Sequence, residues 1–124
     1  MEKLILSPLA KTWILDLDGT IVKHNGYKID GHDTLLEGAK EFLSSVKKDD
    51  MVIFLTSRPA ECAPQTERFL KENGIRYDQI IWGAPYGERI LLNDDKPSGL
   101  SMCYGLRKAR DAKEFPVFEI DESL

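Results

Sequence analysis

The sequence predicts an α/β fold in which a three-layer, Rossmann-like parallel sheet carries helices on both faces. Two observations predict it: short apolar runs alternate with amphipathic segments, and polar clusters follow the apolar runs. Such alternation is typical of parallel sheets packed between helices. The length of 124 residues fits one domain, residues 1–124, with a single core. One site is therefore expected, at the carboxyl ends of the strands.

Two predicted strands and one predicted helix occupy the first half of the chain. Residues 12–17 contain the apolar run Trp-Ile-Leu and predict a buried strand. The continuous apolar run at residues 51–55 predicts a strand covered on both faces. Between them, apolar residues at three- and four-residue spacing predict a helix from about residue 34 to 46, capped by Asp33 or Thr34.

In the second half, one more helix and several short strands are predicted. The helix covers about residues 60–73 and ends at Gly74, and Pro64 must lie near its first turn. Short apolar segments bounded by turn residues predict strands at residues 79–82, 89–92, 101–106 and 116–120.

Composition and charge argue against a polyanionic partner. Hydrophobic residues make up 42% of the chain and charged residues 31%, as in ordinary globular proteins. The net charge is -4 and the positive residues are scattered, so neither nucleic acid nor an anionic membrane is an expected partner. The chain has no apolar run of membrane-spanning length and no signal peptide at its start, which predicts a cytoplasmic location. Cys62 and Cys103 match no metal or redox spacing.

Three polar clusters each follow a predicted strand. They are Asp-Leu-Asp-Gly-Thr at residues 16–20, Thr-Ser-Arg at 56–58 and Asn-Asp-Asp-Lys at 93–96. A parallel sheet would bring all three clusters to one edge, where four carboxylates would repel one another unless a divalent cation with oxygen ligands joined them. The sequence therefore predicts a Mg²⁺ site, with ligands among Asp16, Asp18, Asp94 and Asp95.

The segment Asp-Leu-Asp-Gly-Thr after an N-terminal strand resembles the signature of the haloacid dehalogenase superfamily of phosphatases, and the order of the later clusters agrees. The resemblance implies that Asp16 is a nucleophile that forms an aspartyl-phosphate. It also implies that Asp18 protonates the leaving oxygen and then activates water. Asp94 matches the acidic motif that completes the metal site. Whether Asn93 or Asp95 also ligates the metal stays open.

The other motif residues would hold the phosphoryl group of the substrate. Gly19 permits a tight turn whose backbone N–H groups form an anion nest, and Thr20 shapes that loop. By the resemblance, Thr56 donates a hydrogen bond to the phosphoryl group, with Ser57 as the alternative. Arg58 is assigned to the substrate, although a solvated charge is the simpler interpretation of this side chain.

One element of the family pattern is missing from the sequence. Residues 83–88, which precede the last acids, contain no lysine where many short members of the family have one. Arg89, Lys96 or Arg58 would have to supply the positive charge, and an arginine differs from a lysine in reach and geometry. We place Lys96 in the catalytic set.

Counting residues leaves no room for a cap domain. Residues 19–33 contain three glycines and form only a loop or small hairpin, and residues 58–77 are used by one helix and its turns. The chain therefore resembles the capless type, whose open site accepts bulky substrates or is covered by another subunit of a homo-oligomer. A small phosphorylated metabolite, first of all a sugar phosphate, is the expected substrate.

Two other functions stay open at this point. A non-catalytic member of the same family would keep the fold and bind a phosphorylated ligand or a protein. A receiver-like signalling domain would also have an acidic magnesium pocket. It would carry its phosphorylated aspartate after a middle strand, whereas here Thr56 follows the middle strand.

Overall fold

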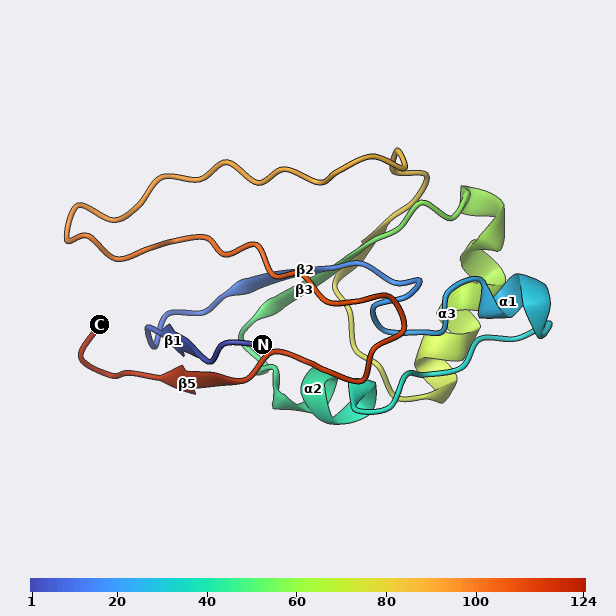
Figure 1. Ribbon diagram of the computed structural model, residues 1–124, viewed down its shortest axis with the longest axis horizontal. Coiled ribbons are helices and arrows are strands. Elements are labelled where there is room, and N and C mark those ends of the chain that lie inside the picture. The colour runs from blue at the N-terminus through green and yellow to red at the C-terminus, as the bar shows by residue number, and fades with distance from the viewer.

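Three parallel strands form the larger of two sheets in the computed structural model, which describes all 124 residues (Figure 1). The strands are β1 (Leu4–Leu6), β2 (Thr12–Leu15), β3 (Met51–Leu55), β4 (Gln79–Ile81) and β5 (Phe118–Ile120). The helices are α1 (Gly26–Ile29), α2 (Ala39–Ser45) and α3 (Ala63–Glu72), and the 3₁₀ turn η1 (Ala60–Cys62) precedes α3. The larger sheet has the order β2-β3-β4, and β1 pairs with β5 in a second sheet. The predicted α/β fold with parallel strands is confirmed, and the strands divide between two sheets.

The central strand β3 sets the direction of the larger sheet. Thr12 of β2 lies opposite Met51, and Ile53 lies opposite Gln79 of β4, both in parallel register. Val52 and Phe54 of β3 are 2% and 0% exposed, as expected for a strand covered by packed side chains. Because all three strands run in the same direction, their carboxyl ends lie at one edge of the sheet.

Helix α3 and the loop after β2 enclose the core with this sheet. The fully buried core cluster consists of Leu17, Ile21, Val22, Ala39, Val52, Phe54, Leu70 and Ile75. The predicted helix is confirmed as η1 followed by α3, with Pro64 in the first turn, and Gly74 adopts the left-handed φ of 66° just beyond its end. No helix in the structure is both long and apolar enough to cross a bilayer.

Helix α2 begins later than the sequence predicts. The chain is still extended at Leu35, which forms an antiparallel bridge with Val22. Gly38, at a φ of 88°, is the N-cap residue of the helix. The prediction that Asp33 or Thr34 caps α2 is therefore wrong, and the Asp33 side chain has a different partner, described below.

The predicted strands at residues 89–92 and 101–106 do not form. Residues 82–117, here called the long loop, contain neither helix nor strand, and their orange part extends past the amino ends of β2 and β3 (Figure 1). Ile90 and Leu92 stay 91% and 96% exposed because no neighbouring strand pairs with this segment. The extended segment predicted at 116–120 forms as β5, and its partner β1 was not predicted.

Candidate active site

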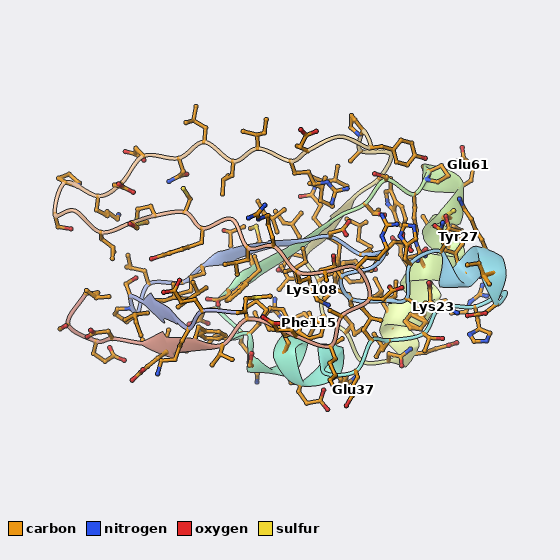
Figure 2. The ribbon with its side chains drawn as sticks, in the orientation of Figure 1. Lys23, Tyr27, Glu37, Glu61, Lys108 and Phe115 are labelled. Atoms are coloured by element: carbon orange, nitrogen blue, oxygen red, sulfur yellow. The ribbon has the colours of Figure 1, made fainter.

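The candidate site lies where β2 and β3 end, at the side of the molecule where Figure 2 shows Tyr27 of α1. Asp16 directly follows β2, and residues 56–58 directly follow β3. Leu17, only 1% exposed, anchors the loop after β2 in the core. The chain turns at Gly19, which has a φ of 82°, so that the backbone N–H groups of residues 20–22 return to the Leu17 carbonyl. The predicted tight turn after the two acids is confirmed, but the predicted anion nest does not form, because the N–H groups of residues 19–22 already donate to carbonyls of the turn itself.

The Asp16 carboxylate is held at both oxygens and still reaches solvent. Its Oδ2 accepts a hydrogen bond from the Thr20 hydroxyl at 2.8 Å, and its Oδ1 accepts one from Nη1 of Arg89 at 2.8 Å. The Asp16 side chain remains 38% exposed. A small anion in solution can therefore approach this carboxylate on its Arg89 side.

Arg89 supplies the positive charge nearest to Asp16. Its Nη1 also donates to the Leu55 carbonyl at 3.0 Å, and its Nη2 contacts Oγ of Ser57 at 3.4 Å. The guanidinium thus spans the carboxyl ends of β2 and β3, although Arg89 itself belongs to the long loop. Of the three residues considered as replacements for the missing lysine, Arg89 is the one that contacts the predicted nucleophile.

Arg58 is a buried charge. The residue is 3% exposed, so the interpretation of it as a solvated side chain is wrong. Nε and Nη2 each donate to Asp18 at 2.9 Å, and Nη1 and Nη2 donate to Asp33 at 3.0 and 2.7 Å. Nη1 also donates to the Thr66 hydroxyl at 2.9 Å, and the guanidinium lies 4.0 Å from the centre of the Tyr27 ring. All five N–H donors of this arginine are therefore occupied by protein groups.

The electrostatics of Arg58 follow from these contacts. Burial by itself would lower the pKa of Arg58, but its hydrogen bonds and ion pairs with Asp18 and Asp33 outweigh burial and raise the pKa above its ordinary value. The guanidinium therefore stays charged at every accessible pH. Burial also raises the pKa of the Tyr27 hydroxyl, whose ring lies beside this cluster.

The two hydroxyl candidates after β3 have different environments. Thr56 is 1% exposed, and its Oγ1 accepts the backbone N–H of Arg58 at 3.1 Å. Ser57 is half-buried, and its hydroxyl lies between Arg89 and the carbonyl of Pro85, at 3.4 Å from each. Ser57, the alternative in the sequence prediction, therefore has the closer connection to Asp16.

The third predicted cluster lies on the long loop, which runs away from the ends of β2 and β3 (Figure 1). Oδ1 of Asp95 accepts the backbone N–H of Met102 at 3.3 Å, and the Asn93 side chain donates to the backbone carbonyl of Asp94 at 2.9 Å. The backbone N–H of Lys96 donates to the Leu100 carbonyl in a local turn. The contacts of this cluster are thus within the loop and do not include Asp16 or Asp18.

The arrangement does not bring the four predicted Mg²⁺ ligands together, and the magnesium requirement stays a prediction. Both oxygens of Asp18 accept hydrogen bonds from Arg58, and no three His, Cys, Asp or Glu side chains converge in a way that suits a metal ion. Asp94 and Asp95 lie on the long loop, and the outer edge of β2, the strand that Asp16 follows, has no partner strand.

The end of the long loop returns to the site and covers the turn after β2. Nζ of Lys108 donates to the Thr20 carbonyl at 3.1 Å and lies 4.1 Å from the centre of the Phe115 ring, beside which Figure 2 shows it. The backbone N–H of Asp111 donates to the Gly19 carbonyl at 2.8 Å. Burial lowers the pKa of Lys108, while nearby Asp111 opposes that shift.

Sequence reasoning did not assign Asp33, Thr66, Tyr27 or Lys108 to the site. Asp33 was predicted to be a helix cap, and it lies 25 residues from Arg58 in the sequence. No spacing rule connects residues so far apart, and none of the four belongs to a motif. The only available signal was that Asp33 stands at the end of the loop that follows the two acids.

Comparison of the chain with protein-family models gives no match, and comparisons with curated proteins and with solved structures give none either. The function therefore has to be argued from the residues and their geometry.

Proposed function

We propose that this protein is a phosphatase that hydrolyses a small phosphate monoester through an aspartyl-phosphate on Asp16. The observation that carries the proposal is the environment of this carboxylate. It is 38% exposed at the carboxyl end of β2, fixed at Oδ2 by Thr20 and paired at Oδ1 with Arg89. A positioned carboxylate beside a cation suits phosphoryl transfer, which needs alignment and charge neutralisation more than a strong nucleophile.

In the first step Oδ1 of Asp16 attacks phosphorus, and the bond from phosphorus to the ester oxygen breaks. Arg89 moves from Oδ1 to the phosphoryl oxygens, where it stabilises the charge of the transition state. The Ser57 hydroxyl, which accepts from Arg89 and donates to the Pro85 carbonyl at 3.4 Å, turns its proton from that carbonyl to the same oxygens. Asp18 in its protonated form, with one oxygen released from its Arg58 contact, gives its proton to the leaving oxygen, which departs as an alcohol.

The second step returns the enzyme to its starting state. Asp18, now a carboxylate, accepts a proton from a water molecule, whose oxygen attacks the phosphorus of the aspartyl-phosphate. The bond between phosphorus and the Asp16 oxygen breaks, which frees the Asp16 carboxylate and releases inorganic phosphate. Arg58 does not bind the phosphoryl group in either step, because all its N–H donors are occupied by protein groups.

Several features of the proposal rest on the sequence, some on the family resemblance and others on residue patterns. These are membership of the haloacid dehalogenase superfamily, the three-layer capless arrangement, the Mg²⁺ requirement with Asp94 and Asp95 as ligands, the catalytic roles of Thr56 and Lys96, the sugar phosphate substrate, the homo-oligomer and the cytoplasmic location. The openness of the site supports the capless arrangement, because only a short loop and the one-turn helix α1 separate Asp18 from Asp33.

The test is hydrolysis of an aryl phosphate by the purified protein with Mg²⁺ present. We expect turnover by the wild type, loss of turnover in Asp16→Asn, and full turnover in Asp49→Asn. Asp49 is the matched control because it is an exposed aspartate two residues before the start of β3, at the opposite end of the sheet. Turnover that survives Asp16→Asn would refute the mechanism. In wild type quenched during turnover, mass spectrometry should find one phosphoryl group on the peptide that contains Asp16.

One observation favours a second candidate, a non-catalytic phosphate-binding protein. Both oxygens of Asp16 accept hydrogen bonds from protein groups, so the site resembles a closed ion pair. This candidate predicts saturable binding of a phosphate ester with no release of inorganic phosphate. No observation favours the receiver-like alternative, since Asp16 follows the edge strand β2 and Thr56 follows the central strand β3.

A further inference from the structure

We propose that Asp33, acting through Arg58, positions the carboxyl group of Asp18 for proton transfer to the leaving group. This inference rests on the proposed function, in which Asp18 is the general acid. It makes Asp33 a positioning residue, because Asp33 contacts neither substrate nor the reacting atoms.

The guanidinium of Arg58 is a rigid bridge between the two carboxylates. One edge of its plane, Nε and Nη2, meets both oxygens of Asp18 at 2.9 Å. The other edge, Nη1 and Nη2, meets both oxygens of Asp33 at 3.0 and 2.7 Å. Two-point contacts on both edges fix the orientation of each carboxylate as well as its distance.

The two carboxylates at the ends of this bridge differ in burial. The side chains of Asp33 and Arg58 are 2% and 1% exposed, whereas the side chain of Asp18 is 18% exposed. Solvent and substrate can therefore reach only the Asp18 end. The Asp33 end is held inside the protein, where Arg58 also meets the Thr66 hydroxyl of α3 and the Tyr27 ring of α1.

The composition of the cluster argues against a purely structural role. Buried ion pairs contribute little net stability compared with apolar packing, since desolvation offsets their attraction. Here two carboxylates share one guanidinium, so the cluster has an excess negative charge when both are ionised and is neutral when Asp18 holds the proton that it donates. The arrangement instead leaves one carboxylate restrained but accessible, which is what a general acid requires.

The dependence of rate on the leaving group separates positioning from folding. An alkyl phosphate needs a proton on its leaving oxygen, whereas a dinitrophenyl phosphate releases a stable anion and needs none. In Asp33→Asn, Arg58 keeps its charge but loses one of its two anchoring carboxylates, and Asp18 loses its fixed orientation. We expect kcat/KM to fall about 100-fold for the alkyl ester, with little change for the dinitrophenyl ester.

Two further variants make the test decisive. Asp30→Asn is the matched control, because Asp30 lies on the same loop but pairs with Lys23 at the surface, so both esters should keep their wild-type rates. Arg58→Lys keeps the charge and loses the two-edged geometry, so it should show the same selective loss as Asp33→Asn. If Asp33→Asn does not fold, Arg58→Lys serves as the test variant in its place.

The outcomes distinguish this inference from the proposed function. Wild-type turnover that persists in Asp16→Asn defeats the proposed function, and the inference falls with it. Where turnover depends on Asp16, an equal loss for both esters in Asp33→Asn and Arg58→Lys, or no loss for either, overturns the positioning role alone. Selective loss for the alkyl ester supports it.

Discussion

Replacing Arg89 by methionine should remove most of the activity and almost none of the stability. Arg89 is the cation that pairs with Oδ1 of Asp16 and, in the proposed mechanism, transfers to the phosphoryl oxygens. Methionine keeps an apolar stem similar to that of arginine but has no charge and cannot donate a hydrogen bond. The variant therefore separates the contribution of Arg89 to the fold from its contribution to the reaction.

The expected effect of Arg89→Met on stability is smaller than its effect on activity because the ion pair is exposed. The side chains of Arg89 and Asp16 are 33% and 38% exposed, and a pair so well solvated contributes less than about 1 kcal/mol to the free energy of unfolding. In the transition state the same donor faces concentrated negative charge. Loss of one such preorganised donor costs about 3–4 kcal/mol, or roughly 100- to 1000-fold in kcat.

The assay combines turnover with unfolding. We expect Arg89→Met to lower kcat/KM for an aryl phosphate by at least about 100-fold and to leave the urea midpoint close to that of the wild type. Arg107→Met is the control, since Arg107 is an exposed arginine of the same loop that takes part in no hydrogen bond or ion pair. A rate within a few-fold of the wild type, or a loss of several kcal/mol of stability, would refute the reasoning.

Three further outcomes are expected. Excess chelator should abolish turnover if the predicted Mg²⁺ requirement holds, and full turnover with chelator present would contradict it. In urea unfolding we expect Gly19→Ala to lower the free energy of unfolding by about 1–2 kcal/mol or more. Gly31→Ala should lower it less. Both glycines have positive φ, but only at Gly19 would the added Cβ lie close to a neighbour, 3.0 Å from Cγ of Arg110. Burial raises the pKa of Tyr27 above the ordinary 10.0, so its contribution to stability is complete below pH 10 and is lost as the pH rises through the folded pKa. Tyr27→Phe should therefore make the fall of stability at alkaline pH less steep, and an unchanged slope would count against this shift.

The strands of the larger sheet could be predicted because each is encoded locally. Met51–Leu55 is a continuous apolar run, and such a run between polar residues has few alternatives to a buried strand. The same holds for the helix that ends before Gly74, where the glycine marks the end directly. Local patterns of this kind need no knowledge of what packs against them.

The long loop could not be predicted because a strand also needs a partner. Ile90 and Leu92 have the composition of a strand, yet they remain 91% and 96% exposed, and the free edge of β2 is not paired with them. Strand propensity largely measures packing against neighbours, so the sequence of this segment alone cannot decide the outcome. The predicted strand 89–92 and the predicted ligands Asp94 and Asp95 therefore depend on the same pairing.

In the candidate site, too, only the contacts between residues close in sequence could be predicted. Asp16 and Thr20 are four residues apart, so their hydrogen bond follows from the turn between them and was within reach of a local argument. The contacts of Arg58 with Asp18 and Asp33 join residues 40 and 25 positions apart, and no single-sequence pattern reports them. The side chain that looked like a solvated charge is consequently the most completely bonded one in the site.

The two aspartates of the pentapeptide have opposite environments because the residue between them is buried. Leu17 is 1% exposed and fixes the backbone in the core, so the acids on either side are directed to different partners. Asp16 meets the half-exposed Arg89, a partner that can move to an incoming anion. Asp18 meets the buried Arg58, a partner that cannot move without breaking its other contacts. In the proposed mechanism the nucleophile must be released and the acid must be held, which requires this asymmetry. Replacing Arg89 and replacing Arg58 should therefore damage different parts of the reaction.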